Sequence, residues 1–164
     1  MNAYATAGWE NFFVAQVGAS AALTGLLFVA VSLNLKQILE SPQLPGRAAE
    51  ALVILLGVLA ASTIGLVPGQ SRTALGGELL ATGVLVWIIP LVLQIPVMGQ
   101  YWHRPMWIWP RLLATQLATV PLVVAAASLL AGRGGGLYWL VPAVILSIAA
   151  AVFDAWILLV EILR

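Results

Sequence analysis

The sequence predicts an all-α fold: a polytopic transmembrane helix bundle with five spans. Two observations predict it. First, 62% of the 164 residues are hydrophobic and 8% are charged, whereas a soluble domain carries roughly 25% charged residues. Second, five apolar segments each come near the roughly 20 residues that cross a hydrocarbon core. A chain of this composition cannot cover itself with a water-facing surface, so lipid must be its solvent.

The five segments follow one another with short connections. They run from about 13–37, 48–67, 76–98, 111–131 and 138–163. Prolines and glycines interrupt the helical pattern between them, for example in 41–46 and 132–136. Short connections predict antiparallel neighbours within one domain over residues 1–164. No positive charge precedes the first segment, so we expect it to stay as a helix rather than be cleaved as a signal peptide.

The distribution of Lys and Arg predicts the orientation. With five spans, one side of the membrane would hold 5 of the 7 basic residues: Lys36, Arg47, Arg104, Arg111 and Arg164. The other side would hold Arg72 and Arg133. Because short cytoplasmic loops are enriched in Lys and Arg, we expect the N-terminus outside the cell and the C-terminus in the cytoplasm. The membrane that we expect is a cell inner (plasma) membrane.

An aromatic and basic segment separates the third and fourth spans. Tyr and Trp favour the headgroup layer, and Arg suits anionic headgroups. We therefore predict an interfacial anchor formed by Trp102, His103, Arg104, Trp107 and Trp109. An aromatic ligand or partner site is the alternative. His103 is the sole histidine and has no metal-ligand spacing around it, so we expect no metal site.

Asp154 is the strongest functional signal, because it interrupts an apolar stretch roughly 10 to 15 Å from the C-terminal membrane boundary. An acid at that depth is costly and should face the bundle interior or a wet cavity. Antiparallel pairing predicts a proton or cation site of Asp154, Thr119, Gln116, Thr115 and Gln94. The alternatives are a structural hydrogen-bond network and a salt bridge between Asp154 and Arg111.

Three other acids have a simpler interpretation. Glu10, Glu50 and Glu78 each sit in or just before the first turns of a predicted helix. A carboxylate there complements the positive end of the helix dipole. We interpret all three in this way, with Glu78 the next candidate for function because two glycines precede it.

Small residues form stripes on the first two predicted helices. The second helix carries Gly57, Ala61 and Gly65 at four-residue spacing, and the first carries Gly18, Gly25 and Ser32 at seven-residue spacing. Such stripes let helices pack closely in lipid. They hold either this bundle or several protomers together, and we expect at least one to serve a homo-oligomer.

Several function classes find no support. There is no cysteine, no serine with a histidine base at a matching depth, no pair of intramembrane acids on one helix face and no phosphate-binding loop. The net charge is +1 without a basic tract, which argues against nucleic acid as a partner. We therefore expect a protein that is not an enzyme and uses no cofactor.

The N-terminal half resembles a group of small multispanning bacterial membrane proteins, some labelled modulators of a membrane-bound ATP-dependent protease. Four stretches within residues 9 to 80 carry the resemblance: 9–14, 23–35, 44–48 and 66–71. It implies that Asn34, Arg47 and Gln70 matter for structure or for contact with a partner. It carries no catalytic motif onto this chain.

Two functions follow as hypotheses. The first is an oligomeric membrane protein that moves a proton or small cation past Asp154. The second is an accessory or regulatory subunit of a larger membrane complex, such as a membrane protease. Lipid binding at the aromatic segment is a third. An odd number of spans argues against an internally symmetric transporter, so a path would run between protomers or beside the fourth and fifth helices.

Overall fold

The computed structural model describes residues 3–101 and 105–162. Within them the regular structure is helical throughout, with no strand. The elements are α1 (Glu10–Leu33), α2 (Leu35–Glu40), α3 (Leu44–Gly65), α4 (Arg72–Tyr101), α5 (Pro105–Ala131), the 3₁₀ turn η1 (Gly136–Trp139) and α6 (Leu140–Ile162).

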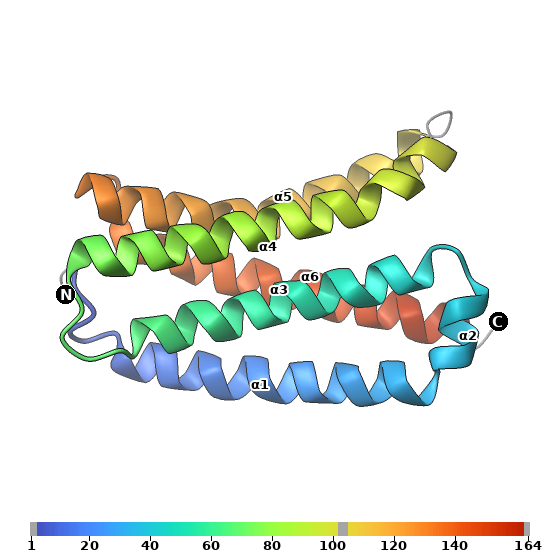
Figure 1. The fold of residues 1–164 in the computed structure, drawn as a ribbon, viewed down its shortest axis with the longest axis horizontal. Helices are drawn as coiled ribbons and strands as arrows, with labels where there is room; N and C mark the ends of the chain where they lie inside the picture. Colours follow the sequence, from blue (N-terminus) through green and yellow to red (C-terminus); the bar gives the residue numbers. More distant parts are fainter. Residues whose placement is uncertain (1–2, 102–104, 163–164) are drawn as a thin grey trace.

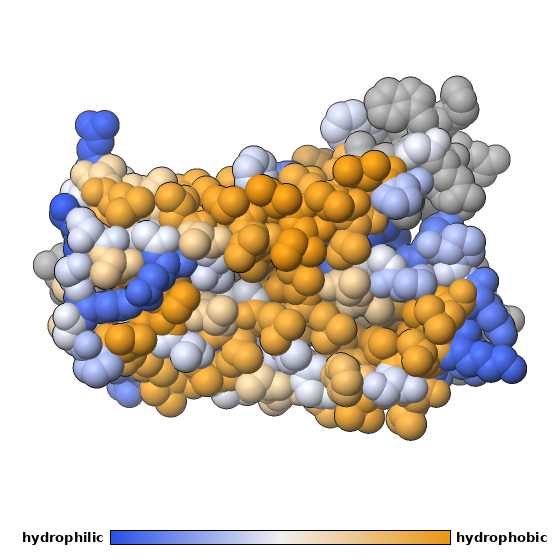
Figure 2. All heavy atoms as spheres, viewed as in Figure 1, coloured by the Kyte–Doolittle hydropathy of each residue, from blue (hydrophilic) through white to orange (hydrophobic). Residues whose placement is uncertain are grey.

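The predicted fold class is confirmed. Among the described residues, α1, α3, α4, α5 and the η1–α6 segment are five helices long and apolar enough to cross a membrane. Figure 2 shows hydrophobic residues along the length of the face in view, with hydrophilic residues gathering toward its two ends. The fold is therefore compatible with an integral membrane protein. The side of the membrane on which each terminus lies stays a prediction.

Successive long helices run antiparallel to one another (Figure 1). Helix α3 is central: it packs against α1, α4 and α6, while α5 packs against α4 and α6. Helix α1 lies at the edge and packs mainly on α3. The N-terminus and the α3–α4 connection share one end, and α2, the last turns of α4, the first turns of α5 and the C-terminus share the other (Figure 1). We call the second of these the α2 end.

Several helix boundaries differ from the predicted ones, including the starts of α4 at Arg72 and of α5 at Pro105. The first span stops at Leu33, because Asn34 leaves the helical conformation and its amide donates to the Ala30 carbonyl oxygen at 2.8 Å. The second begins at Leu44, four residues before the predicted start. Pro45 is the second residue of that helix, where a missing backbone N–H costs no hydrogen bond.

The small-residue stripe of α3 packs inside the bundle. Gly57, Ala61 and Gly65 are all buried. A methyl group added at Gly57 would collide with Val86 of α4, and one at Gly65 would come within 2.6 Å of the Phe13 ring of α1. These glycines let α3 approach two neighbours at once, which explains its central place.

Candidate functional site

The most buried charge in the described chain is Glu50, which is 1% exposed on α3. Its Oε1 accepts a hydrogen bond from Gln94 Nε2 of α4 at 2.6 Å. The same oxygen contacts the Thr115 hydroxyl of α5 at hydrogen-bond distance. Gln94 Nε2 also donates to that hydroxyl at 2.7 Å. Three helices therefore converge on one carboxylate.

Arg111 supplies the countercharge to Glu50. Its Nη2 and Nε donate to Glu50 Oε2 at 2.7 and 3.1 Å. The Arg111 side chain is 9% exposed, and its third nitrogen, Nη1, is buried without a hydrogen-bond partner among the described residues. Because α5 begins at Pro105 and not at 111, Arg111 lies within the helix and reaches across to α3. The pair is charge-assisted and largely cut off from water.

A second ion pair joins α3 to α6. Arg47 Nη1 donates to Asp154 Oδ1 at 3.0 Å, and the two side chains are 19% and 10% exposed. Arg47 lies three residues before Glu50, so α3 carries one member of each pair about one turn apart. Asp154 faces the bundle interior, as predicted for an acid within a span.

The two ion pairs share a polar cavity. A hollow of about 120 Å³ is lined by residues of three helices: Arg47, Glu50, Ile54, Pro110, Arg111, Ala114, Thr115, Ala150, Phe153, Asp154 and Ile157. Because about 10–15 Å³ on this measure holds one water, the hollow has room for several waters. We call it the charged cavity. It lies toward the α2 end, because its residues come from the start of α3 and α5 and the last part of α6.

Beyond the charged cavity the described interior is mostly apolar, although the hydroxyl side chains of Thr119 and Ser147 are also buried there. Ala118, Leu122 and Ala125 of α5 are buried there. A further hollow, lined by residues of α1, α3, α4, α5 and α6, measures about 10 Å³, which is at the lower limit for a single water. Ile54 lines both this hollow and the charged cavity, and the two are separate among the described residues.

The structure brings together part of the predicted site. Thr115 and Asp154 line the same cavity, and Gln94 joins Thr115 and Glu50. Two other predicted members form hydrogen bonds outside this cavity. The Thr119 hydroxyl donates to the Thr115 carbonyl oxygen at 2.7 Å. Gln116 Oε1 accepts from Trp87 Nε1 of α4 at 2.8 Å.

Sequence reasoning missed Glu50, Arg47 and Arg111 as site residues. The helix-dipole interpretation of Glu50 is wrong, because α3 starts at Leu44 and Glu50 lies six residues further on, facing α4 and α5. The alternative pairing of Asp154 with Arg111 is also wrong, since Arg111 binds Glu50 and Asp154 binds Arg47. Pro45 was the signal for the correct boundary, because proline favours the first turn of a helix and so indicates a start near Leu44.

The other candidate acids lie at the surface, far from this network in the chain. Glu10 is exposed in the first turn of α1 and accepts from the Gly8 backbone N–H at 2.8 Å. Glu78 is exposed and accepts from the Gln70 amide at 2.5 Å. Its helix-dipole interpretation is also wrong, because α4 begins at Arg72 and has no acidic residue in its first turn. Within the described residues, no group of three or more His, Cys, Asp or Glu could hold a metal ion.

The predicted aromatic anchor is described in part. Trp102, His103 and Arg104 lie outside the described residues. Trp107 belongs to α5, and Trp109 is 61% exposed on the same helix. An exposed Trp near the end of a span is typical of the headgroup layer, and the interfacial anchor stays a prediction.

The small-residue stripe of α1 lies on the outside of the bundle. Gly18, Gly25 and Ser32 are exposed, and nothing comes within 4 Å of a methyl group added at either glycine. In its most apolar window, α1 has 11% of its residues buried, against 56% for α3. This stripe makes no contact that holds the described protomer together.

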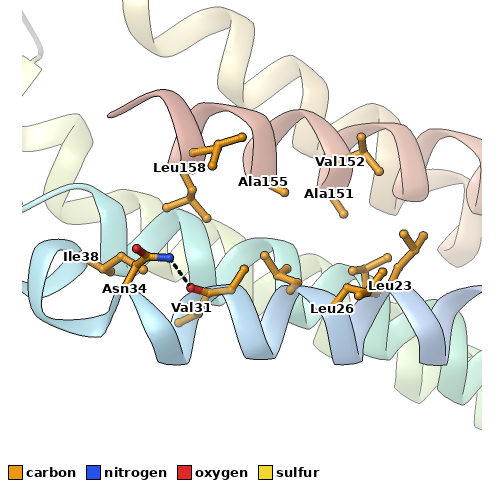
Figure 3. Close-up of a pocket in the computed structure, with 13 residues that line it drawn as sticks. Leu23, Leu26, Val31, Asn34, Ile38, Ala151, Val152, Ala155 and Leu158 are labelled. Carbon is orange, nitrogen blue, oxygen red and sulfur yellow. Dashed lines mark hydrogen bonds between the residues drawn. The ribbon is translucent and has the colours of Figure 1, made fainter. Parts of the chain in front are cut away.

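Beside α1 runs an apolar groove, drawn in Figure 3. It measures about 310 Å³ and lies between α1 and α6, with Leu55 of α3 also lining it. Its lining is aliphatic apart from Asn34 at one end, whose amide is already bonded to the Ala30 carbonyl (Figure 3). A groove of this chemistry offers van der Waals contact and no charge, so it suits hydrocarbon.

No family model, no curated protein and no solved structure matches this chain. The candidate site therefore rests on the geometry of the chain itself, and the resemblance of the N-terminal half stays a prediction.

Proposed function

We propose that this chain is a non-enzymatic integral membrane protein that handles protons at Asp154. The observation that carries the proposal is the charged cavity, in which an acid of α6 faces a second acid and two arginines inside the spans. Buried ionisable groups within a membrane are expensive and commonly mark proton or ion pathways.

The proton is a better cargo for this cavity than a metal cation. Arg47 and Arg111 both line it, and their positive charges oppose a cation that has shed its water. A proton needs a carboxylate to accept it and hydrogen-bonding groups around that carboxylate, both of which the cavity provides.

Asp154 is a better proton acceptor than Glu50. Both oxygens of Glu50 are engaged, by Gln94 and Thr115 on one side and by Arg111 on the other. Asp154 has a single ion pair through one oxygen, to the more exposed Arg47. Protonating Asp154 therefore disturbs fewer interactions than protonating Glu50.

Full passage across the membrane requires more than the protomer interior as described. The described interior beyond the charged cavity is mostly apolar, and the hollow there has room for at most one water. We propose that the proton enters from the α2 end and that the other half of the path forms between protomers or through helix movement.

Proton flux in reconstituted vesicles tests this proposal. With potassium and valinomycin clamping the membrane potential, we expect the wild type to dissipate a pH gradient and Asp154→Asn to lose that flux. The matched control is Glu40→Gln, since Glu40 is exposed at the same end of the bundle. Equal flux in the wild type and Asp154→Asn, or no flux in either, would overturn proton transport.

We propose self-association through the outer face of α1 as a second role. The specific observation is that Gly18, Gly25 and Ser32 line an open face of the least buried span. Small residues lower the separation at which helices pack in lipid, so this stripe suits a second copy of α1. An accessory role in a larger membrane complex, such as a membrane protease, would use the same face.

Mild-detergent purification from native membranes separates these outcomes. We expect a homo-oligomer of defined size for the wild type and a shift toward monomer for Gly25→Leu, because a leucine holds the helices apart. A monomeric wild type would count against self-association. Co-purification of a single larger complex, lost in Gly25→Leu, would favour the accessory role instead.

A further inference from the structure

Arg111 has one nitrogen that the Glu50 pair does not use. Nε and Nη2 bind the carboxylate, whereas Nη1 is buried and has no acceptor among the described residues. The side chain is nine-tenths buried and lines the charged cavity. A buried cationic donor without an acceptor is costly, which indicates that something in the cavity can accept from it.

A second guanidinium lines the same cavity from α3. Arg47 Nη1 has Asp154 Oδ1 as its acceptor. The remaining lining is largely apolar, including Ile54, Ala150 and Phe153. A volume of about 120 Å³ can enclose a small inorganic anion together with one or two waters.

The charge of the cavity depends on Asp154. Among the described residues, its charged groups are Arg47 and Glu50 of α3, Arg111 of α5 and Asp154 of α6, and α4 adds the neutral Gln94 to Glu50. With all four ionised the sum is zero. When Asp154 takes a proton, the sum becomes +1 and Arg47 loses its ion-pair partner, because a neutral carboxylic acid is a weaker acceptor than a carboxylate. Only Glu50 then balances the two arginines.

We propose that the charged cavity binds one small inorganic anion of the size of chloride, held between Arg47 and Arg111, when Asp154 is protonated. The proton bonds to the Asp154 carboxylate and the anion balances its charge, so the two enter as a neutral pair. This inference rests on the proposed proton exchange at Asp154 and names its companion ion.

Equilibrium binding of radioactive chloride to the purified full-length protein tests the inference, with gluconate as the replacement anion. We expect one chloride per chain at acidic pH, with affinity falling by up to about tenfold for each unit of rising pH, because one proton accompanies each anion. Asp154→Asn should bind chloride at every pH, since asparagine is neutral throughout. Arg47→Gln should bind more weakly, and Glu40→Gln should match the wild type.

The variants separate the two proposals. If neither the wild type nor Asp154→Asn binds chloride, the anion site is overturned, whereas proton flux measured in gluconate still decides the proposed function. If Asp154→Asn and the wild type both bind chloride with no dependence on pH, the anion site holds and its linkage to the Asp154 proton is overturned. Chloride binding that Arg47→Gln leaves unchanged would overturn the placement between the two arginines.

Discussion

At the scale of single residues, the bundle places two acids of the same chemistry in different surroundings. Glu50 is held by Arg111, Gln94 and Thr115, and is almost fully buried. Asp154 has one ion pair with a partly exposed arginine. The first arrangement fixes three helices together, whereas the second can open and close at one contact. We therefore propose a structural role for Glu50 and proton exchange for Asp154.

Replacing Glu50 should expose its structural role. Glu50→Gln leaves the Arg111 guanidinium buried without its countercharge, so we expect a loss of about 3–5 kcal/mol in unfolding free energy. Unfolding in mixed micelles by added dodecyl sulfate measures it, with the exposed Glu40→Gln as the control. A change below about 0.5 kcal/mol, as for an ordinary surface substitution, would contradict the buried ion pair.

At the scale of helices, the two small-residue stripes have different surroundings. The sequence pattern is similar in both, and nothing in the spacing alone says which stripe faces inward. The structure buries Gly57, Ala61 and Gly65 of α3 and leaves Gly18 and Gly25 of α1 open. The choice depends on which helix is central, and that is a property of the tertiary arrangement.

A matched pair of leucine substitutions tests this difference. Gly57→Leu should collide with Val86 and lower the unfolding free energy by about 1–3 kcal/mol or more. Gly25→Leu points away from the protomer and should leave the stability of the monomer within about 0.5 kcal/mol of the wild type. The same micelle titration, made at a protein concentration that gives monomers, compares them. Equal losses would contradict the central position of α3.

At the scale of the whole molecule, hydrophobic run lengths were enough to predict five spans and their order, because lipid fixes the length of a crossing helix. The candidate site was predicted in part. Asp154 stood out as an acid in an apolar run, but its arginine partner did not. Pairing across helices depends on where each begins, and prolines near the starts of α3 and α5 displaced both boundaries.

The whole arrangement places the two partly or fully buried ion pairs at one end of the bundle. They and the charged cavity lie toward the α2 end, and the described interior beyond them is mostly apolar. Water at that end can reach Asp154 through the partly exposed Arg47 pair. We propose that Asp154 exchanges a proton through this cavity.

Infrared difference spectroscopy of the purified protein measures that exchange most directly. On a switch from alkaline to acidic buffer, we expect a carboxylic acid band that appears reversibly in the wild type and shifts in heavy water. This band should be missing from Asp154→Asn. Glu40→Gln should keep the band, because its acid is not in the cavity. A spectrum that is the same in the wild type and Asp154→Asn at acidic and at alkaline pH would contradict proton exchange at Asp154.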